Sequence, residues 1–155
     1  MSSRLQAELK QRKPFSSLEQ EASLSVARTA ALLEHAGAAA LKPHGLTPTQ
    51  YNALRILRGA VPEGLCRNEV RDRLVARVPD ATRLLDRLVD VGLVVRAREG
   101  EDQRFVRARI TPAGLDLLGA LDGVLSDLHD RQLGHLGERK LRTLIELLAE
   151  ARERL

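Results

Sequence analysis

The fold is decided by residues 80–118, DATRLLDRLVDVGLVVRAREGEDQRFVRARITPAGLDLL, in which the hydrophobic period changes twice. The first part predicts a helix from Pro79 to about Val91, because its apolar residues recur at i, i+3, i+4 and i+7. These residues are Ala81, Leu84, Leu85 and Leu88. After Gly92 the apolar residues alternate, which predicts two strands, at 93–96 and 104–110, around a polar turn. Thr111-Pro112 then opens another helix, since threonine caps a helix well and proline suits its first turn.

Toward the N-terminus the sequence predicts a basic arm followed by three helices. Residues 1–15 are polar and basic and contain Pro14, so we expect a flexible arm. The capping-box pattern Ser16-Ser17-Leu18-Glu19 opens the first helix. The helices are expected at residues 16–42, 47–59 and 67–74, with a loop at 60–66.

Toward the C-terminus two leucine-rich helices are expected, separated by Gly134 and Gly137. Their leucine stripes pack either within the chain or across a two-fold axis, and we favour the second because little else covers two long terminal helices. The fold class is therefore mainly α with a small β-hairpin wing. The predicted domains are a winged helix-turn-helix at 46–111 and a helical dimerisation region at 16–45 and 112–155.

Composition points to an acidic partner. The chain has 155 residues, a net charge of +4 and a pI near 9.8, and its 25 basic residues are mostly arginine. Between Arg67 and Arg109 there are 11 arginines and 8 acids. Guanidinium groups bind phosphates and guanine edges with two parallel hydrogen bonds, which lysine cannot do. A solvated arginine-rich surface is the alternative, because net charge speaks to partners and not to fold.

The helix from Pro79 has the features of a DNA-recognition helix. Opposite its apolar face it carries hydrogen-bonding side chains: Asp80, Thr82, Arg83, Asp86 and Arg87. The hairpin after it carries Arg96, Arg98, Arg104, Arg107 and Arg109, and arginines of this kind insert into narrow minor grooves. An ordinary solvated helix face and a charged sheet edge are the alternatives for each element alone. Together, helix and wing favour duplex DNA as the partner.

The stretch at 80–118 resembles the central signature of the MarR family. The markers are Thr82-Arg83, Leu88, Gly92-Leu93-Val94, the triplet Asp102-Gln103-Arg104, and Thr111 with Gly114; residues 46–59, LTPTQYNALRILRG, resemble the second helix of the family. The resemblance implies an obligate dimer, two winged modules on a palindrome, a wing arginine at Arg104 braced by Asp102, and a ligand crevice. One departure is Val75, where the family often has glycine.

Three sets of functional residues are thus predicted. The DNA-contacting set is Arg77, Asp80, Thr82, Arg83, Arg87, Arg98, Asp102 and Arg104. The dimerisation set is Leu118, Leu125, Leu141, Leu144, Leu148 and Leu155. Tyr51 and Arg55 are expected to line an effector site for a small, mostly apolar anion or a phenol.

Other classes of function lack their sequence signals. Cys66 is the only cysteine, and the four histidines have no metal-ligand spacing, so we expect no metal and no cofactor. No nucleophile elbow or phosphate loop occurs, and an enzyme is not expected. The N-terminus lacks an apolar signal segment and no apolar run is long enough to span a membrane, so we expect a cytoplasmic regulator, probably of the ligand-responsive repressor type, binding as a homodimer. The alternatives are a winged helix used for protein contact and an architectural DNA binder without sequence preference.

Overall fold

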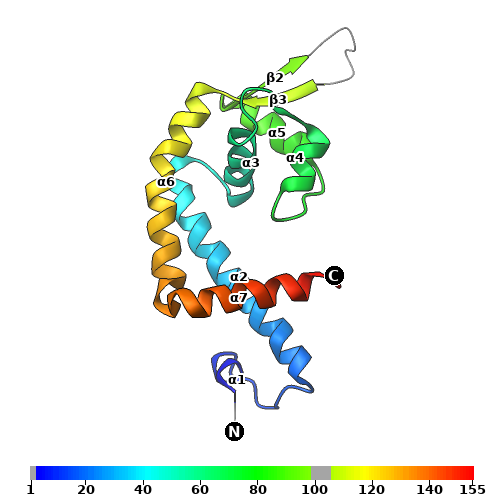
Figure 1. Ribbon diagram of the computed structural model, residues 1–155, viewed down its shortest axis with the longest axis vertical. Coiled ribbons are helices and arrows are strands. Elements are labelled where there is room, and N and C mark those ends of the chain that lie inside the picture. The colour runs from blue at the N-terminus through cyan, green and yellow to red at the C-terminus, as the bar shows by residue number, and fades with distance from the viewer. Residues whose placement is uncertain (1–2, 99–105) are drawn as a thin grey trace.

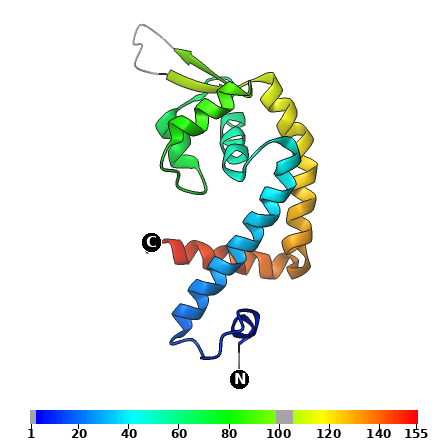
Figure 2. The ribbon, with the colours of Figure 1, turned by 180° about the vertical axis from the view of Figure 1, so that it is seen from behind.

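The computed structural model describes residues 3–98 and 106–155. Its winged part lies at one end and its long helices extend to the other (Figures 1 and 2). The architecture is mainly helical with one small antiparallel sheet, which confirms the predicted fold class. Asp102 and Arg104 lie outside the described residues.

The N-terminal segment contains two α-helices, α1 (Arg4–Glu8) and α2 (Leu18–Leu41), and a 3₁₀ turn, η1 (Lys42–His44). Helix α1 forms where the sequence predicts an arm without regular structure. Ser3 caps it by accepting a hydrogen bond from the backbone N–H of Gln6, at 3.2 Å, and Leu5 is buried. Helix α2 begins after Ser17, whose hydroxyl accepts from the backbone N–H of Gln20 at 3.2 Å. Serine at this position satisfies one of the donors that a helix start leaves open.

The winged part contains α3 (Pro48–Arg58), α4 (Arg67–Arg73), α5 (Ala81–Asp90) and a three-stranded sheet. The strands are β1 (Leu65–Cys66), β2 (Val94–Arg98) and β3 (Val106–Ile110), in the order β1-β3-β2. Strand β2 runs two residues beyond the predicted strand, because its pairing with β3 continues to Arg98 opposite Val106.

Strand β1 corrects the prediction of a loop over residues 60–66. Leu65 pairs with Ala108 and Cys66 with Arg107, so β1 forms the outer edge of the sheet. Two residues are too few to show an alternating pattern in the sequence. Gly64, just before β1, has φ +74°, and the backbone of β3 lies directly against it.

The core joins the winged part to the long helices. Buried aliphatic residues from α3, α4, α5 and the sheet form one cluster with the ends of α2 and α6. In the part of the chain that the structure describes, no polar or charged residue is buried. Leu118 and Leu125 belong to this cluster, so the structure corrects their assignment to a dimer interface: they are already covered within one chain.

Helix α6 (Pro112–Leu133) connects the wing to the far end of the molecule, where η2 (Gly134–Leu136) and α7 (Gly137–Arg152) follow. Only Thr111 separates α6 from β3. The Thr111 hydroxyl donates to the carbonyl of Gly92 at 2.7 Å and accepts from the backbone N–H of Gly114 at 3.1 Å. The wing and α6 are therefore joined without a flexible linker.

Helices α3 and α6 are also joined at the surface. The guanidinium of Arg58 makes two hydrogen bonds to the carboxylate of Asp122, at 2.9 and 3.1 Å. This interaction holds the pKa of Asp122 below its ordinary value and raises that of Arg58. Charge-assisted pairs with this fork geometry are directional, so the pair orients the two helices as well as attracting them.

Candidate nucleic-acid interface

Helix α5 has the amphipathic character that the sequence predicts. Ala81, Leu85 and Leu88 are buried, whereas Arg83 and Arg87 are exposed. Asp80 is the N-cap, and its carboxylate accepts from the backbone N–H of Arg83 at 2.9 Å. A carboxylate in this place also interacts favourably with the positive end of the helix dipole. Asp80 therefore has a structural role that the sequence analysis missed, although aspartate before a helical run is a known capping signal.

The turn between α4 and α5 tolerates Val75. Its side chain is 91% exposed, and its backbone N–H donates to the Asn52 side chain at 2.9 Å. Over residues 3–98 and 106–155 only Lys10 among non-glycine residues has a positive φ, so Val75 takes an ordinary backbone conformation. Glycine is not required at this position, and the departure from the family pattern introduces no strain.

Several arginines of the sheet are held by other parts of the chain. Arg107 donates to the carbonyl of Gly64 at 3.1 Å, and Arg109 donates to that of Glu63 at 3.1 Å. Arg96 forms an ion pair with Asp86 and also donates to the backbone carbonyl of Thr82 at 3.4 Å. These side chains therefore fasten the sheet to its surroundings, a role that their residue type alone does not reveal.

Four of the predicted DNA-contacting arginines are exposed and have no hydrogen-bond or ion-pair partner within the described residues. They are Arg77, Arg83, Arg87 and Arg98. Arg83 and Arg87 lie one turn apart on α5, Arg77 lies in the connector before it, and Arg98 lies at the end of β2. Their donors are directed to solvent and are available to an external acceptor such as phosphate.

Two acidic groups near this face are occupied within the chain. Asp80 caps α5, and Asp86 is paired with Arg96. The sequence analysis places both among groups that read base edges, but the ion pair removes Asp86 from that role in this structure. Nothing in the sequence signals that pair, because its members lie ten residues apart on different elements.

Two cavities flank α5. One of about 620 Å³ lies between α4, α5 and the sheet, and its lining includes Cys66, Arg67, Thr82, Leu85, Arg96 and Arg98. The other, of about 360 Å³, lies between the start of α3 and α5, with Gln50, Asp80, Arg83 and Arg87 in its lining. Both hollows carry arginine side chains over an apolar floor.

The predicted effector residues do not line either of these cavities. Tyr51 and Arg55 lie on α3 one turn apart, and the guanidinium carbon of Arg55 is 5.9 Å from the centre of the Tyr51 ring. This distance is within the range of a cation–π interaction. Tyr51 is half-buried against the core, so it presents only one side to solvent.

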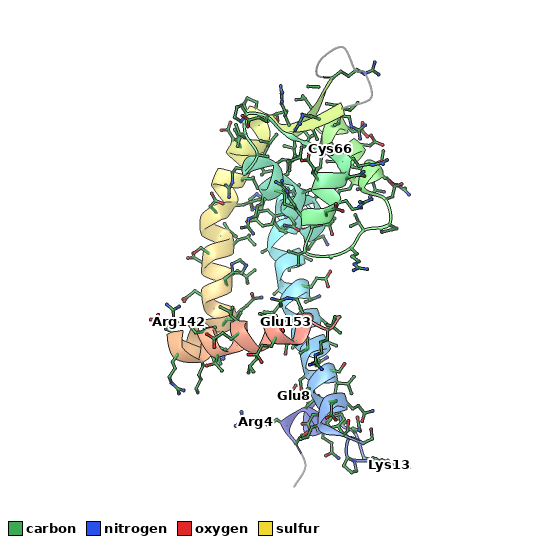
Figure 3. All side chains as sticks on the ribbon, turned by 45° about the vertical axis from the view of Figure 1, so that its right-hand side comes forward. Arg4, Glu8, Lys13, Cys66, Arg142 and Glu153 are labelled. Atoms are coloured by element: carbon green, nitrogen blue, oxygen red, sulfur yellow. The ribbon has the colours of Figure 1, made fainter. Side chains whose placement is uncertain are left out.

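Cys66 acts as the N-cap of α4. Its backbone N–H donates to the Glu69 carboxylate at 2.8 Å, and this hydrogen bond lowers the pKa of Glu69. Figure 3 shows Cys66 in the winged part and Arg4, Glu8 and Lys13 at the opposite end of the molecule. The basic N-terminal segment therefore does not extend the arginine face of its own chain.

Two other classes of site have no support in the described residues. No group of three or more histidine, cysteine or acidic side chains there could hold a metal ion. No helix there is both long enough and apolar enough to cross a membrane.

Comparisons with known proteins agree with this geometry. Residues 44–104 match the profile of the MarR family. A solved MarR transcription factor from Planctomyces limnophilus is 43% identical, with a TM-score of 0.68, over 87% of this chain and 98% of that one. The HTH-type transcriptional regulator FarR of Neisseria gonorrhoeae is 30% identical over 71% of this chain and 74% of its own length. The structure of S. aureus MepR with DNA shares the fold, with a TM-score of 0.78 and 19% identity over 86% of this chain and 97% of that one. These relatives are regulators rather than enzymes, and the chain belongs to the MarR family of DNA-binding transcription regulators.

Proposed function

We propose that the protein is a homodimeric, ligand-responsive repressor that binds a palindromic duplex operator. The observation that carries this proposal is the exposed pair Arg83 and Arg87 on α5, with Arg98 of the wing on the same part of the molecule. A helix with long donors on its exposed face fits a major groove, and a wing arginine fits the adjacent minor groove.

The terminal helices support the dimer. None of the residues of α7 is buried, and α7 packs against η2 rather than against the winged part. Large apolar side chains are exposed on α2 and α7: Leu18, Val26, Leu32, Ile145 and Leu147. Leu141, Leu144 and Leu148 are half-buried and Leu155 is exposed, so these four predicted interface residues remain available to a second copy. A two-fold dimer with α5 presented twice accounts for a palindromic site.

The roles of individual arginines follow from their positions. We infer that Arg83 reads a base edge, because it lies in the first turn of α5, the part of a recognition helix that reaches the bases. Arg77, Arg87 and Arg98 are proposed phosphate contacts. Thr82 is a further proposed contact, and Asp102 and Arg104 stay predictions from the family resemblance.

The test compares Arg83→Ala with Arg98→Ala by selection of bound duplexes from a random library, followed by affinity measurements at several salt concentrations. Arg83→Ala is expected to relax base preference symmetrically in both half-sites, with a loss of about 1–3 kcal/mol in discrimination. Arg98→Ala is expected to weaken specific and random duplexes alike and to lower the salt slope by about 1.

An unchanged selected sequence for Arg83→Ala would remove α5 from the reading role. If neither variant alters DNA binding, a protein-contact role for the arginine face replaces this proposal. A library from which the wild type enriches no sequence while still binding tightly would indicate an architectural DNA binder instead.

For the effector we propose a small aromatic anion or phenol bound beside Tyr51 and Arg55, in the space between the dimer helices and the winged part. The arrangement that supports it is a half-buried ring next to a cation. A panel of substituted benzoates and phenols, screened by thermal shift, should include stabilisers that lose their effect in Tyr51→Ala. Stabilisers that act equally on Tyr51→Ala would move the site elsewhere.

A further inference from the structure

The wing and the recognition helix are joined by a polar bridge centred on Arg96. From β2, its guanidinium reaches α5 at two points one helical turn apart, the Asp86 carboxylate and the Thr82 carbonyl, the second at 3.4 Å. A planar guanidinium with donors on both of its terminal nitrogens can hold two acceptors at once. The bridge therefore restrains both the distance and the angle between strand and helix.

The same turn of α5 is held from a second direction. Arg67, the first residue of α4, donates to the Thr82 hydroxyl at 3.2 Å. Thr82 thus lies where polar contacts from α4 and β2 meet on α5. Because Asp86 accepts from Arg96, its negative charge is balanced within the chain and is not left facing a DNA phosphate.

Apolar packing does not fill this corner. The cavity of about 620 Å³ lies here, and Arg67, Thr82 and Arg96 all line it. Packed side chains normally fix the angle between a helix and a sheet. Where they leave a hollow of this size, directional side-chain bonds have to supply that restraint.

The bridge also determines the direction of a free arginine. Arg98 follows Arg96 by two residues on β2, so both side chains lie on the same face of the strand. Arg98 has no hydrogen-bond partner within the described residues, and it lines the same cavity. The orientation of β2 at Arg96 therefore sets the position of Arg98 relative to Arg83 on α5.

We propose that Arg96 is a positioning residue: without contacting DNA itself, it fixes the wing against α5 so that major-groove and minor-groove contacts are made in register. This inference rests on the proposed function, and it names the device by which the same site discriminates between sequences. Loss of the bridge frees the wing, so correct and incorrect duplexes are then bound with more similar affinity.

The experiment uses the full-length protein and two probes, the duplex that the wild type enriches from a random library and a random duplex of equal length. The variants are Arg96→Ala, Asp86→Ala, the double variant, and Arg98→Ala as the matched control. Arg96→Ala should lower the affinity ratio between the probes about tenfold, with the salt slope unchanged. Asp86→Ala should lower the ratio similarly, because any gain from removing a negative charge applies to both probes and cancels.

The double variant should be no worse than either single variant, because both remove the same bridge. Arg98→Ala should instead weaken both probes and lower the salt slope by about 1. Arg96→Lys keeps the ion pair and loses the bond to Thr82, so it should recover part of the ratio. Because the bridge is partly exposed, melting temperatures should change by only roughly 2 °C, which separates positioning from unfolding.

A lowered salt slope together with equal weakening of both probes would make Arg96 a phosphate contact and overturn the inference. Additive effects of the two single variants would overturn it as well. If the wild type discriminates and Arg96→Ala discriminates equally, this inference alone fails. If the wild type enriches no duplex, the proposed function fails with it.

Discussion

At the scale of single residues, Gly64 is the position with the least freedom. It combines a φ of +74° with a close approach of β3, and a Cβ there would overlap the carbonyl oxygen of Ala108 and the Arg109 side chain. Gly92 has a similar φ, +76°, but nothing lies within 4 Å of its Cβ position. The two glycines therefore share a backbone conformation and differ only in crowding.

This difference predicts unequal effects of alanine. Gly92→Ala should lower the free energy of unfolding by about 1 kcal/mol, the usual penalty of a left-handed alanine. Gly64→Ala should lower it by about 3 kcal/mol, because β1 must also move away from β3. Urea denaturation at unchanged m-value measures both. Equal losses for the two variants would mean that β1 yields freely and that the contact is unimportant.

Residue types could be predicted from the sequence, but their partners could not. Periodicity places Arg83 and Arg87 on the exposed face of α5, as the structure has them. It cannot distinguish Arg98, which is free, from Arg96, which is paired. Pairing depends on which element lies opposite a side chain, and a single sequence with a hairpin in between does not encode that in its spacing.

At the scale of elements, the start of α5 rests on the Asp80 cap. Asp80→Ala should lower the free energy of unfolding by about 1 kcal/mol and the melting temperature by a few degrees, because the N–H of Arg83 loses its acceptor. Asp80→Asn should retain almost all of the stability, since asparagine caps about as well as aspartate. Thermal denaturation followed by circular dichroism tests this. If both variants melt like the wild type, the cap contributes nothing to the fold.

The junction of α3 and α6 gives a dependence on pH. The pKa of Asp122 is lowered by its bond to Arg58, so the stabilisation is fully present above the unfolded pKa of about 3.9. It is lost as the pH falls through the lower folded value, where the carboxylate takes up a proton. Melting temperatures of wild type and Asp122→Asn should therefore differ at pH 7 and converge below about pH 4. Arg58→Gln should show the same convergence, and a difference that persists at pH 2.5 would contradict the assignment.

Longer elements follow from the sequence more reliably than short ones. Helix α5 repeats its apolar residues over three turns and carries an aspartate cap, so pattern and capping agree. Strand β1 has two residues and α1 has five, and both depend on neighbours that no local pattern identifies. The third strand of the sheet was missed for this physical reason.

At the scale of the whole molecule, the exposed apolar side chains of α7 predict a dimer. Ile145 is 64% exposed and Leu147 is 58% exposed, although burial of each is worth about 2 kcal/mol. The double variant Ile145→Glu with Leu147→Glu should raise the dissociation constant on the order of 100-fold or more, since charges would enter an apolar interface. Sedimentation velocity at micromolar concentration measures the change.

The matched control is Val75→Glu, which places the same charge on an even more exposed valine of the α4–α5 connector. It should sediment like the wild type. A wild type that sediments as a monomer at these concentrations would contradict the dimer, as would a glutamate pair in α7 that has no effect on association.

Helix α6 joins the wing to the far end of the molecule with only Thr111 between it and β3. Its 22 residues make a rod roughly 33 Å long, at about 1.5 Å per residue. Mechanically it is a lever with the hairpin fixed to one end: a tilt of about 2° at the other end moves the hairpin by about 1 Å. Hydrogen bonds tolerate displacements of only about half an ångström. A tilt too small to alter the outline of the molecule is therefore enough to switch its grip on a surface that must be matched to atomic precision.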